Sequence, residues 1–186
     1  MTSRRPGQRA GVARADVLAA ARAITAEQGY PALSMRSVAR RLGVAPNTLY
    51  SHVGSRADLL DVLLDDVLAQ VPEPTAGLGP AEALRAVLTG TYAVLLAHRD
   101  LVPLYLERSG ARGPHAVRLG ELMTAQLLAA GVGRDDVADA VRVLVVHTIG
   151  VAAFAAPAPG DRPLDDAAVE RSFRVGLDWL LRGILS

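Results

Sequence analysis

The sequence contains no cysteine. This absence excludes disulfides, zinc sites built from thiolates, and cysteine nucleophiles. Lysine is also missing, because all 20 basic residues are arginine, and this excludes Schiff-base chemistry and phosphate loops that depend on a lysine. No apolar run reaches the ~20 residues needed to cross a bilayer. The longest, 143–156, is interrupted by His147, Thr148 and Gly150 and is interpreted as a buried helix.

The first residues also lack the features of a secretory signal. Residues 1–11 are basic and polar, with no apolar segment after them. We therefore expect a cytoplasmic protein with no membrane partner, in which 1–11 form a flexible basic arm.

Charge is distributed unevenly along the chain. Residues 1–56 contain nine arginines against Asp16 and Glu27, a net charge of +7, so the rest must carry −6 to give the total of +1. Such a division suits a protein in which one part approaches phosphates and the other does not. A solvated charged surface would give the same count, so charge alone does not decide between them.

Apolar residues recur at helical spacing throughout, and no segment shows the alternation of a strand. The sequence therefore predicts an all-α fold. Prolines and glycines concentrate in 71–80, which predicts a linker there. The predicted helices cover 13–28, 34–42, 46–53, 55–68, 81–98, 101–108, 114–130, 135–156 and 165–185.

The second and third predicted helices, joined by a turn with Gly43, form a helix-turn-helix. Arginines surround the first of the two, and the second carries polar side chains able to bond base edges and phosphates in a major groove. The alternative is a three-helix unit that only packs against something else. The charge excess and the run of polar residues favour DNA binding. The candidate DNA-contacting residues are Ser34, Arg36, Pro46, Asn47, Thr48, Tyr50, Ser51, His52 and Arg56.

Residues 33–53 read LSMRSVARRLGVAPNTLYSHV. Together with Arg56 they resemble the DNA-binding region of TetR-family repressors, especially the tetracycline repressors, and the similarity spans about 13–68. The resemblance implies that the helix from Pro46 is the recognition helix, with Tyr50 and His52 on the sugar-phosphate backbone. It also implies that Arg36 reaches a base and Arg56 a phosphate.

Two departures limit what this resemblance carries over. Ser51 stands where tetracycline repressors have tryptophan, and Pro46-Asn47 replaces their Gln-Pro. The operator sequence of those repressors is therefore not transferred to this chain.

The C-terminal part resembles the regulatory domain of tetracycline repressors at 97–100 and 148–150. This implies a homodimer in which 135–156 and 165–185 pair with their copies as a four-helix bundle. The expected organisation is a helix-turn-helix domain over 12–56, a connecting helix over 57–71, and a ligand-binding and dimerisation domain over 80–186.

The same resemblance implies a cavity for a largely apolar effector. No pair of histidines has the spacing of a metal site, and Tyr105 occupies the place of the histidine that binds magnesium-tetracycline in those repressors, so we expect no cofactor and no metal. The candidate ligand-contacting residues are Tyr92, His98, Tyr105, His115, Met123, Gln126 and His147.

These observations predict a repressor that binds a palindromic operator as a homodimer and is released by a small molecule. An enzyme using Asp135-Asp136 or Asp165-Asp166 is a second hypothesis, but both pairs stand at helix starts, where carboxylates cap the helix. A third is an architectural DNA-binding protein without an effector.

Overall fold

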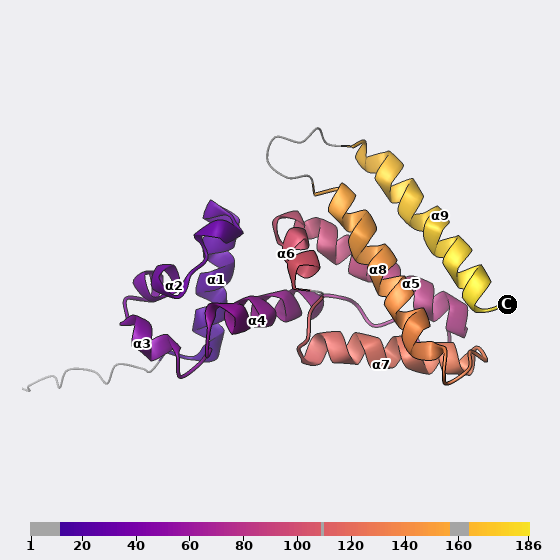
Figure 1. The fold of residues 1–186 in the computed structure, drawn as a ribbon, viewed down its shortest axis with the longest axis horizontal. Coiled ribbons are helices and arrows are strands. Elements are labelled where there is room, and N and C mark those ends of the chain that lie inside the picture. Colours follow the sequence, from indigo (N-terminus) through magenta and orange to yellow (C-terminus); the bar gives the residue numbers. More distant parts are fainter. Residues whose placement is uncertain (1–11, 109, 157–163) are drawn as a thin grey trace, which may run out of the picture. The chain divides into compact units, whose positions relative to one another are not determined.

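The structure, a computed structural model, describes residues 12–108, 110–156 and 164–186. Over these ranges the regular secondary structure is helical, with no strand, which confirms the predicted all-α class (Figure 1). The chain divides into two compact units, one ending at Leu60 and the next beginning at Asp61.

The first unit contains α1 (Arg14–Gln28), α2 (Met35–Leu42), α3 (Pro46–Leu49) and the start of α4 (Arg56–Leu68). Ser34 caps α2, because its Oγ accepts a bond from the Ser37 N–H at 3.0 Å. Gly43 ends α2 in the left-handed region, with φ 67°. The core consists of apolar residues from all four helices, including Val17, Ile24, Val38, Leu49 and Leu59.

Helix α3 is shorter than predicted. It ends at Leu49, and 50–52 form a turn in which the Val53 N–H still bonds the Leu49 carbonyl at 2.9 Å. The Ser51 hydroxyl donates to the Thr48 carbonyl at 2.8 Å, a local bond of the kind that competes with helix continuation. Leu49 and Val53 are both buried, so the apolar pair that predicted a longer helix anchors a helix and a turn.

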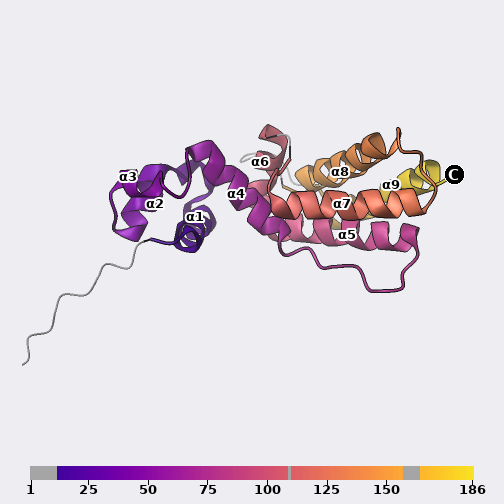
Figure 2. The same cartoon turned by 90° about the horizontal axis from the view of Figure 1, so that it is seen from below.

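Over the described residues, the second unit contains the rest of α4, five further α-helices and a short 3-10 helix (Arg99–Leu101). Helix α5 packs against α7 and α8, and α8 also packs against α7 and α9 (Figures 1 and 2). Each helix begins and ends within three residues of its predicted bounds. They are α5 (Pro80–Ala97), α6 (Val102–Glu107), α7 (Pro114–Ala129), α8 (Val137–Phe154) and α9 (Asp166–Ile184).

Arg99 holds the end of α8 and the start of α9 together. Its guanidinium donates two bonds to the Asp166 carboxylate, at 2.9 and 3.0 Å, and a third to the Ala155 carbonyl at 2.9 Å. Phe173 on α9 stacks on Tyr92 of α5, with ring centroids 4.0 Å apart. Helix α9 is thereby fixed against both α5 and α8.

Helix α8 is long and apolar enough, by length and composition alone, to cross a membrane. Only 28% of it is buried within the chain. The prediction of a buried helix is therefore wrong for this chain by itself, because Val146 and Phe154 are among its exposed residues.

Candidate functional sites

Helix α3 exposes polar side chains to solvent and is held to the core by one buried residue, Leu49. Leu49 is fully buried, whereas Pro46, Asn47 and Thr48 are exposed. Tyr50 is 52% exposed although it is a large aromatic residue. In the turn that follows, Ser51 is exposed and His52 half-buried. The protein core therefore holds this helix without using the side chains that a groove would meet.

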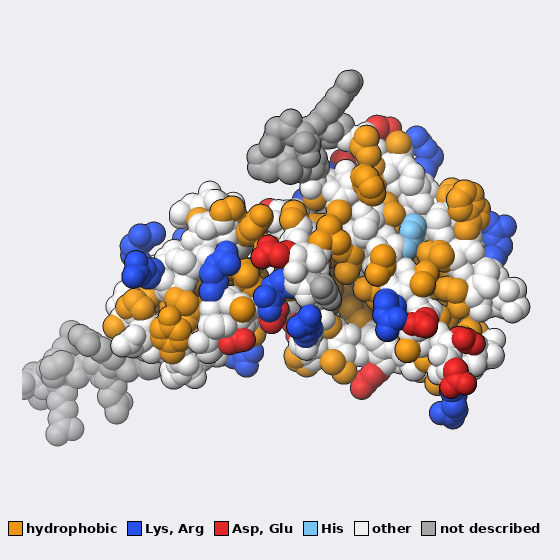
Figure 3. All heavy atoms as spheres, viewed as in Figure 1, with side chains coloured by type: hydrophobic (Ala, Val, Ile, Leu, Met, Phe, Trp, Pro, Cys, Tyr) orange, Lys and Arg blue, Asp and Glu red, His pale blue; other side chains and the backbone are white. Residues whose placement is uncertain are grey.

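The arginines of α2 divide into two kinds. Arg36 and Arg40 are exposed, and arginines are visible on the surface of this unit (Figure 3). Arg41 instead donates two bonds of 2.7 Å to Glu27, which ties α2 to α1. This hydrogen bonding lowers the pKa of the Glu27 carboxyl. One of the positive charges of this unit, that of Arg41, is therefore paired with a carboxylate of the same unit.

Two of the candidate DNA-contacting residues also have structural roles. The Ser34 hydroxyl is engaged in the cap of α2. Arg56, the first residue of α4, donates from Nε to the Leu33 carbonyl at 2.9 Å while its side chain stays exposed. This bond holds the guanidinium at a helix N-terminus, a position that favours anions.

The second unit contains a partly open cavity of about 220 Å³. Its wall is almost entirely aliphatic, and among the described residues it includes no charged side chain. It is lined by Leu68, Leu88, Thr91, Leu95, Tyr105, Gly110, Ala111, Ala116, Leu119, Gly120, Met123, Val141, Val145, Thr148 and Ile149.

The three hydroxyl groups on this wall already donate to backbone carbonyls. Tyr105 donates to Leu64 at 2.6 Å, Thr91 to Val87 at 2.8 Å, and Thr148 to Leu144 at 2.9 Å. Burial raises the pKa of the Tyr105 phenol well above its usual range, so the phenol is neutral. A ligand would find hydroxyl oxygens able to accept hydrogen bonds and no charge.

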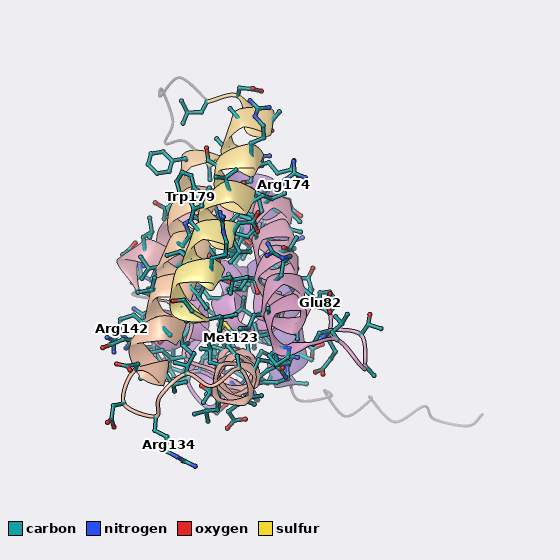
Figure 4. All side chains as sticks on the ribbon, turned by 90° about the vertical axis from the view of Figure 1, so that its right-hand side faces the viewer. Glu82, Met123, Arg134, Arg142, Arg174 and Trp179 are labelled. Atoms are coloured by element: carbon teal, nitrogen blue, oxygen red, sulfur yellow. The ribbon has the colours of Figure 1, made fainter. Side chains whose placement is uncertain are left out.

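Two of the candidate ligand-contacting residues, Tyr105 and Met123, line the cavity. Figure 4 shows Met123 on the inner side of α7, whereas Trp179 lies at the outer surface of α9. His98 is bonded to Gln70 at 3.0 Å. Gln126 and His115 are half-buried and outside the lining.

Tyr92 and His147 face α9 instead of the cavity. Both are stacked on Phe173, and the His147 Nε2 lies 3.1 Å from the Phe173 carbonyl oxygen. The residues that do line the cavity are their neighbours Thr91 and Thr148. A shift of one residue turns a side chain by about 100° around a helix, which is enough to move it to another face.

Helix α4 is attached to α6 and α7 by a set of polar contacts that the sequence did not indicate. Asp61 pairs with Arg108, including a bond of 2.6 Å to Nη2. The buried Asp65 carboxylate accepts the Ala116 N–H at 2.8 Å and the His115 N–H at 3.2 Å, so it caps α7. The sequence signal was weak, because Asp61 and Asp65 are two of four aspartates on α4 and nothing local marks them as tertiary contacts.

Gly113 makes this cap possible. A Cβ at Gly113 would overlap the Asp65 carboxyl group, so a side chain there would push α4 away from the start of α7. The residues after the cap, Ala116, Leu119 and Gly120, line the cavity. One wall of the cavity is thus attached directly to α4.

Helices α8 and α9 carry a group of exposed apolar side chains. Apolar atoms also gather in this region in the space-filling view (Figure 3). Trp179 is 67% exposed. The other members are Val143, Val146, Phe154 and Val175.

The folded first unit and the exposed α3 surface define a helix-turn-helix DNA-binding protein. Residues 17–63 match the family model of bacterial regulatory proteins of the tetR family. The chain is 35% identical over 136 residues to an HTH-type transcriptional regulator of Saccharopolyspora erythraea, covering 72% of this chain and 57% of that regulator. It is 33% identical over 96 residues to the class D tetracycline repressor protein of Escherichia coli, covering 50% of this chain and 44% of the repressor.

Two solved structures extend the similarity to nearly the whole chain. BioQ with its double-stranded DNA operator is 26% identical, with a TM-score of 0.77 and coverage of 94% of this chain and 99% of BioQ. ActR of Streptomyces coelicolor in complex with (S)-DNPA is 25% identical, with a TM-score of 0.80 and coverage of 95% and 98%. The first unit therefore contains a TetR-family DNA-binding domain, as the sequence resemblance predicted, and the relatives that the chain matches are transcriptional regulators.

Proposed function

We propose that the chain is a homodimeric, cytoplasmic repressor that binds a palindromic operator and leaves it when a compact apolar molecule occupies the cavity. One observation carries the proposal: a single chain combines an exposed polar helix in its basic end with an apolar, uncharged cavity in its other unit. An architectural DNA-binding protein has no use for such a cavity. Two similar proteins support the two halves of the proposal. BioQ is solved with its double-stranded DNA operator, and ActR is solved in complex with (S)-DNPA.

On DNA, α3 enters the major groove. Asn47, Thr48 and Ser51 offer donors and acceptors there, and Pro46 starts the helix. Tyr50 and His52 contact the sugar-phosphate backbone. Outside α3, Arg36 reaches a base and Arg56 a phosphate. A dimer places two such helices one helical turn apart, ~34 Å, on a palindrome.

The apolar face of α8 and α9 is covered by a second copy. A monomer that left Trp179, Val146 and Phe154 in water would expose an unusually apolar patch. A membrane is a poorer partner for this face, because the Asp139–Arg142 ion pair lies on α8 and the neighbouring α9 carries several charged residues. Two copies of each helix then form the four-helix bundle.

The effector is uncharged and compact. A cavity of about 220 Å³ is smaller than the ~300–1,000 Å³ of drug-sized sites, and its wall is aliphatic with three hydroxyls. Magnesium is usually held by carboxylates, and the described residues of the wall include no carboxylate. The lining therefore does not fit a magnesium-tetracycline complex.

Effector binding reaches DNA through α4. Tyr105 belongs to the cavity wall and bonds the α4 backbone at Leu64, while Asp65 fixes α4 to α7. A molecule that favours one position of Tyr105 and α7 favours one position of α4, whose first residues belong to the DNA-binding unit. Release requires only that the effector bind the DNA-incompetent arrangement more tightly.

The DNA-binding surface is tested by selecting a duplex from a random pool with the wild-type protein and measuring its affinity by fluorescence anisotropy. Arg36→Ala should weaken binding by about 5- to 150-fold, because a base contact is worth ~1–3 kcal/mol. Tyr50→Ala should also weaken it. Glu121→Ala, on the exposed surface of α7, is the control and should bind as the wild type does. Wild-type affinity and salt dependence in both variants would show that the surface is wrongly assigned.

A further inference from the structure

Gly120 is a glycine that the fold itself does not require. It lies in the middle of α7 and is absent from the residues with positive φ, so any residue could adopt its backbone conformation. Glycine in a helix interior is less stable than alanine. Alanine at this position would therefore make the helix more stable.

Close packing does not explain Gly120 either. A Cβ built at this position meets no atom within 4 Å. Two glycines of this unit differ from Gly120: a Cβ at Gly113 would overlap Asp65, and one at Gly90 would lie 3.2 Å from the Pro72 Cδ. Those two glycines allow two segments to approach, whereas Gly120 borders open space.

The open space beside Gly120 is the cavity, because Gly120 is one of its lining residues. Ala116, one turn earlier on α7, lines the same side, whereas α5 and α8 contribute larger residues such as Leu88 and Ile149. We infer that Gly120 determines effector size: it keeps this side of the cavity open for the bulk of the ligand. The inference rests on the proposed function of the cavity.

A larger residue at 120 should therefore exclude long ligands before short ones. One methylene in an apolar pocket changes discrimination by about 10- to 200-fold. A leucine side chain adds several carbon atoms to the wall. It should reduce the affinity for a ligand that fills the cavity at least tenfold, with a smaller effect on a ligand that leaves space.

Benzene and n-butylbenzene are suitable probes, since an apolar cavity of ~150 Å³ can bind benzene. Their binding to the full-length protein is measured by isothermal titration calorimetry for the wild type, Gly120→Ala and Gly120→Leu. The matched control is Ala125→Leu, which adds three carbon atoms, one fewer than Gly120→Leu, on the exposed side of α7. Circular dichroism checks that each variant is folded.

We expect wild type and Ala125→Leu to bind both probes. In Gly120→Leu the affinity for butylbenzene should fall at least tenfold and the affinity for benzene should fall less. The affinity of Gly120→Ala for butylbenzene should lie between those of the wild type and Gly120→Leu. Gly120→Ala should also raise the melting temperature by about 2–4 °C, because alanine stabilises the helix.

Two results overturn the inference in different ways. If the wild type and both Gly120 variants bind butylbenzene equally, or if Ala125→Leu loses as much as Gly120→Leu, Gly120 does not set ligand size although the cavity binds ligands. If the wild type binds neither probe, the cavity is not an apolar binding site and the proposed effector function falls as well. Should Gly120→Leu fail to fold, the same comparison with Gly120→Ala decides the question.

Discussion

The two units of the chain use their side chains in opposite ways. In the first unit most of the proposed DNA-contacting residues are exposed and the core holds them in place, as Leu49 holds α3. In the second unit the proposed functional feature is a space between helices, and its boundary residues are buried or half-buried. A function that resides in exposed side chains can be inferred from a sequence motif, whereas a cavity depends on how distant helices meet.

Each unit also contains an arginine that donates hydrogen bonds from two nitrogens to one carboxylate. The two ion pairs differ in how exposed their side chains are. Arg41 and Glu27 have side chains 37% and 52% exposed. Arg108 and Asp61 have side chains 23% and 27% exposed. Water screens the first pair more, so the second should matter more for stability.

The largest expected effect comes from separating the two copies. Trp179→Glu places a charge in the proposed contact between subunits, where aromatic residues often contribute ≥2 kcal/mol. The dimer dissociation constant should rise about 30-fold or more in sedimentation equilibrium, and operator affinity should fall with it. Benzene binding should persist, because Trp179 lies outside the cavity lining.

Val117→Glu is the control for this variant, since Val117 is 52% exposed but lies on α7. It should leave the dimer intact. An unchanged dimer in Trp179→Glu would place the subunit contact elsewhere.

A smaller effect, on stability, is expected from removing the less exposed of the two ion pairs, Asp61 with Arg108. Asp61→Asn removes the negative charge facing Arg108 and should lower the free energy of unfolding by about 1 kcal/mol at pH 7, measured by urea denaturation. Glu27→Gln, the matched change in the first unit, should cost less. Equal costs would contradict the argument from exposure.

The same pair predicts a pH dependence. Hydrogen bonds from Arg108 hold the pKa of Asp61 below its usual value. Its contribution is therefore complete at neutral pH and is lost as the pH falls below about 4, through the lowered pKa. On acidification, the free energy of unfolding of Asp61→Asn should fall less than that of the wild type. In Glu27→Gln the Asp61–Arg108 pair is intact, so the free energy of unfolding should fall nearly as much as in the wild type.

Helical periodicity predicted most of the fold. For α7 the expected range was 114–130 and the observed helix is Pro114–Ala129. The main difference was α3, where local hydroxyl bonding near Ser51 accompanies an earlier end. Periodicity reports which face is apolar, and this was sufficient for helices but not for their last turns.

The site was predictable only in part. The polar residues of α3 were found because they follow one another along the chain. The cavity could not be outlined, because choosing Thr148 over His147 requires knowing which face of α8 meets α9. The Asp65 cap on α7 joins residues about 50 positions apart, and no local pattern reports such a contact.

Whether the cavity controls DNA binding is the central question, and one titration tests it most directly. Butylbenzene is added to the wild-type protein bound to its selected duplex, and the dissociation constant of the duplex is followed by anisotropy. Coupling of ordinary strength, ~1–3 kcal/mol, predicts that this constant rises at least fivefold at saturation. If butylbenzene binds by calorimetry while the affinity for the duplex stays unchanged, the two units work independently and the account is contradicted.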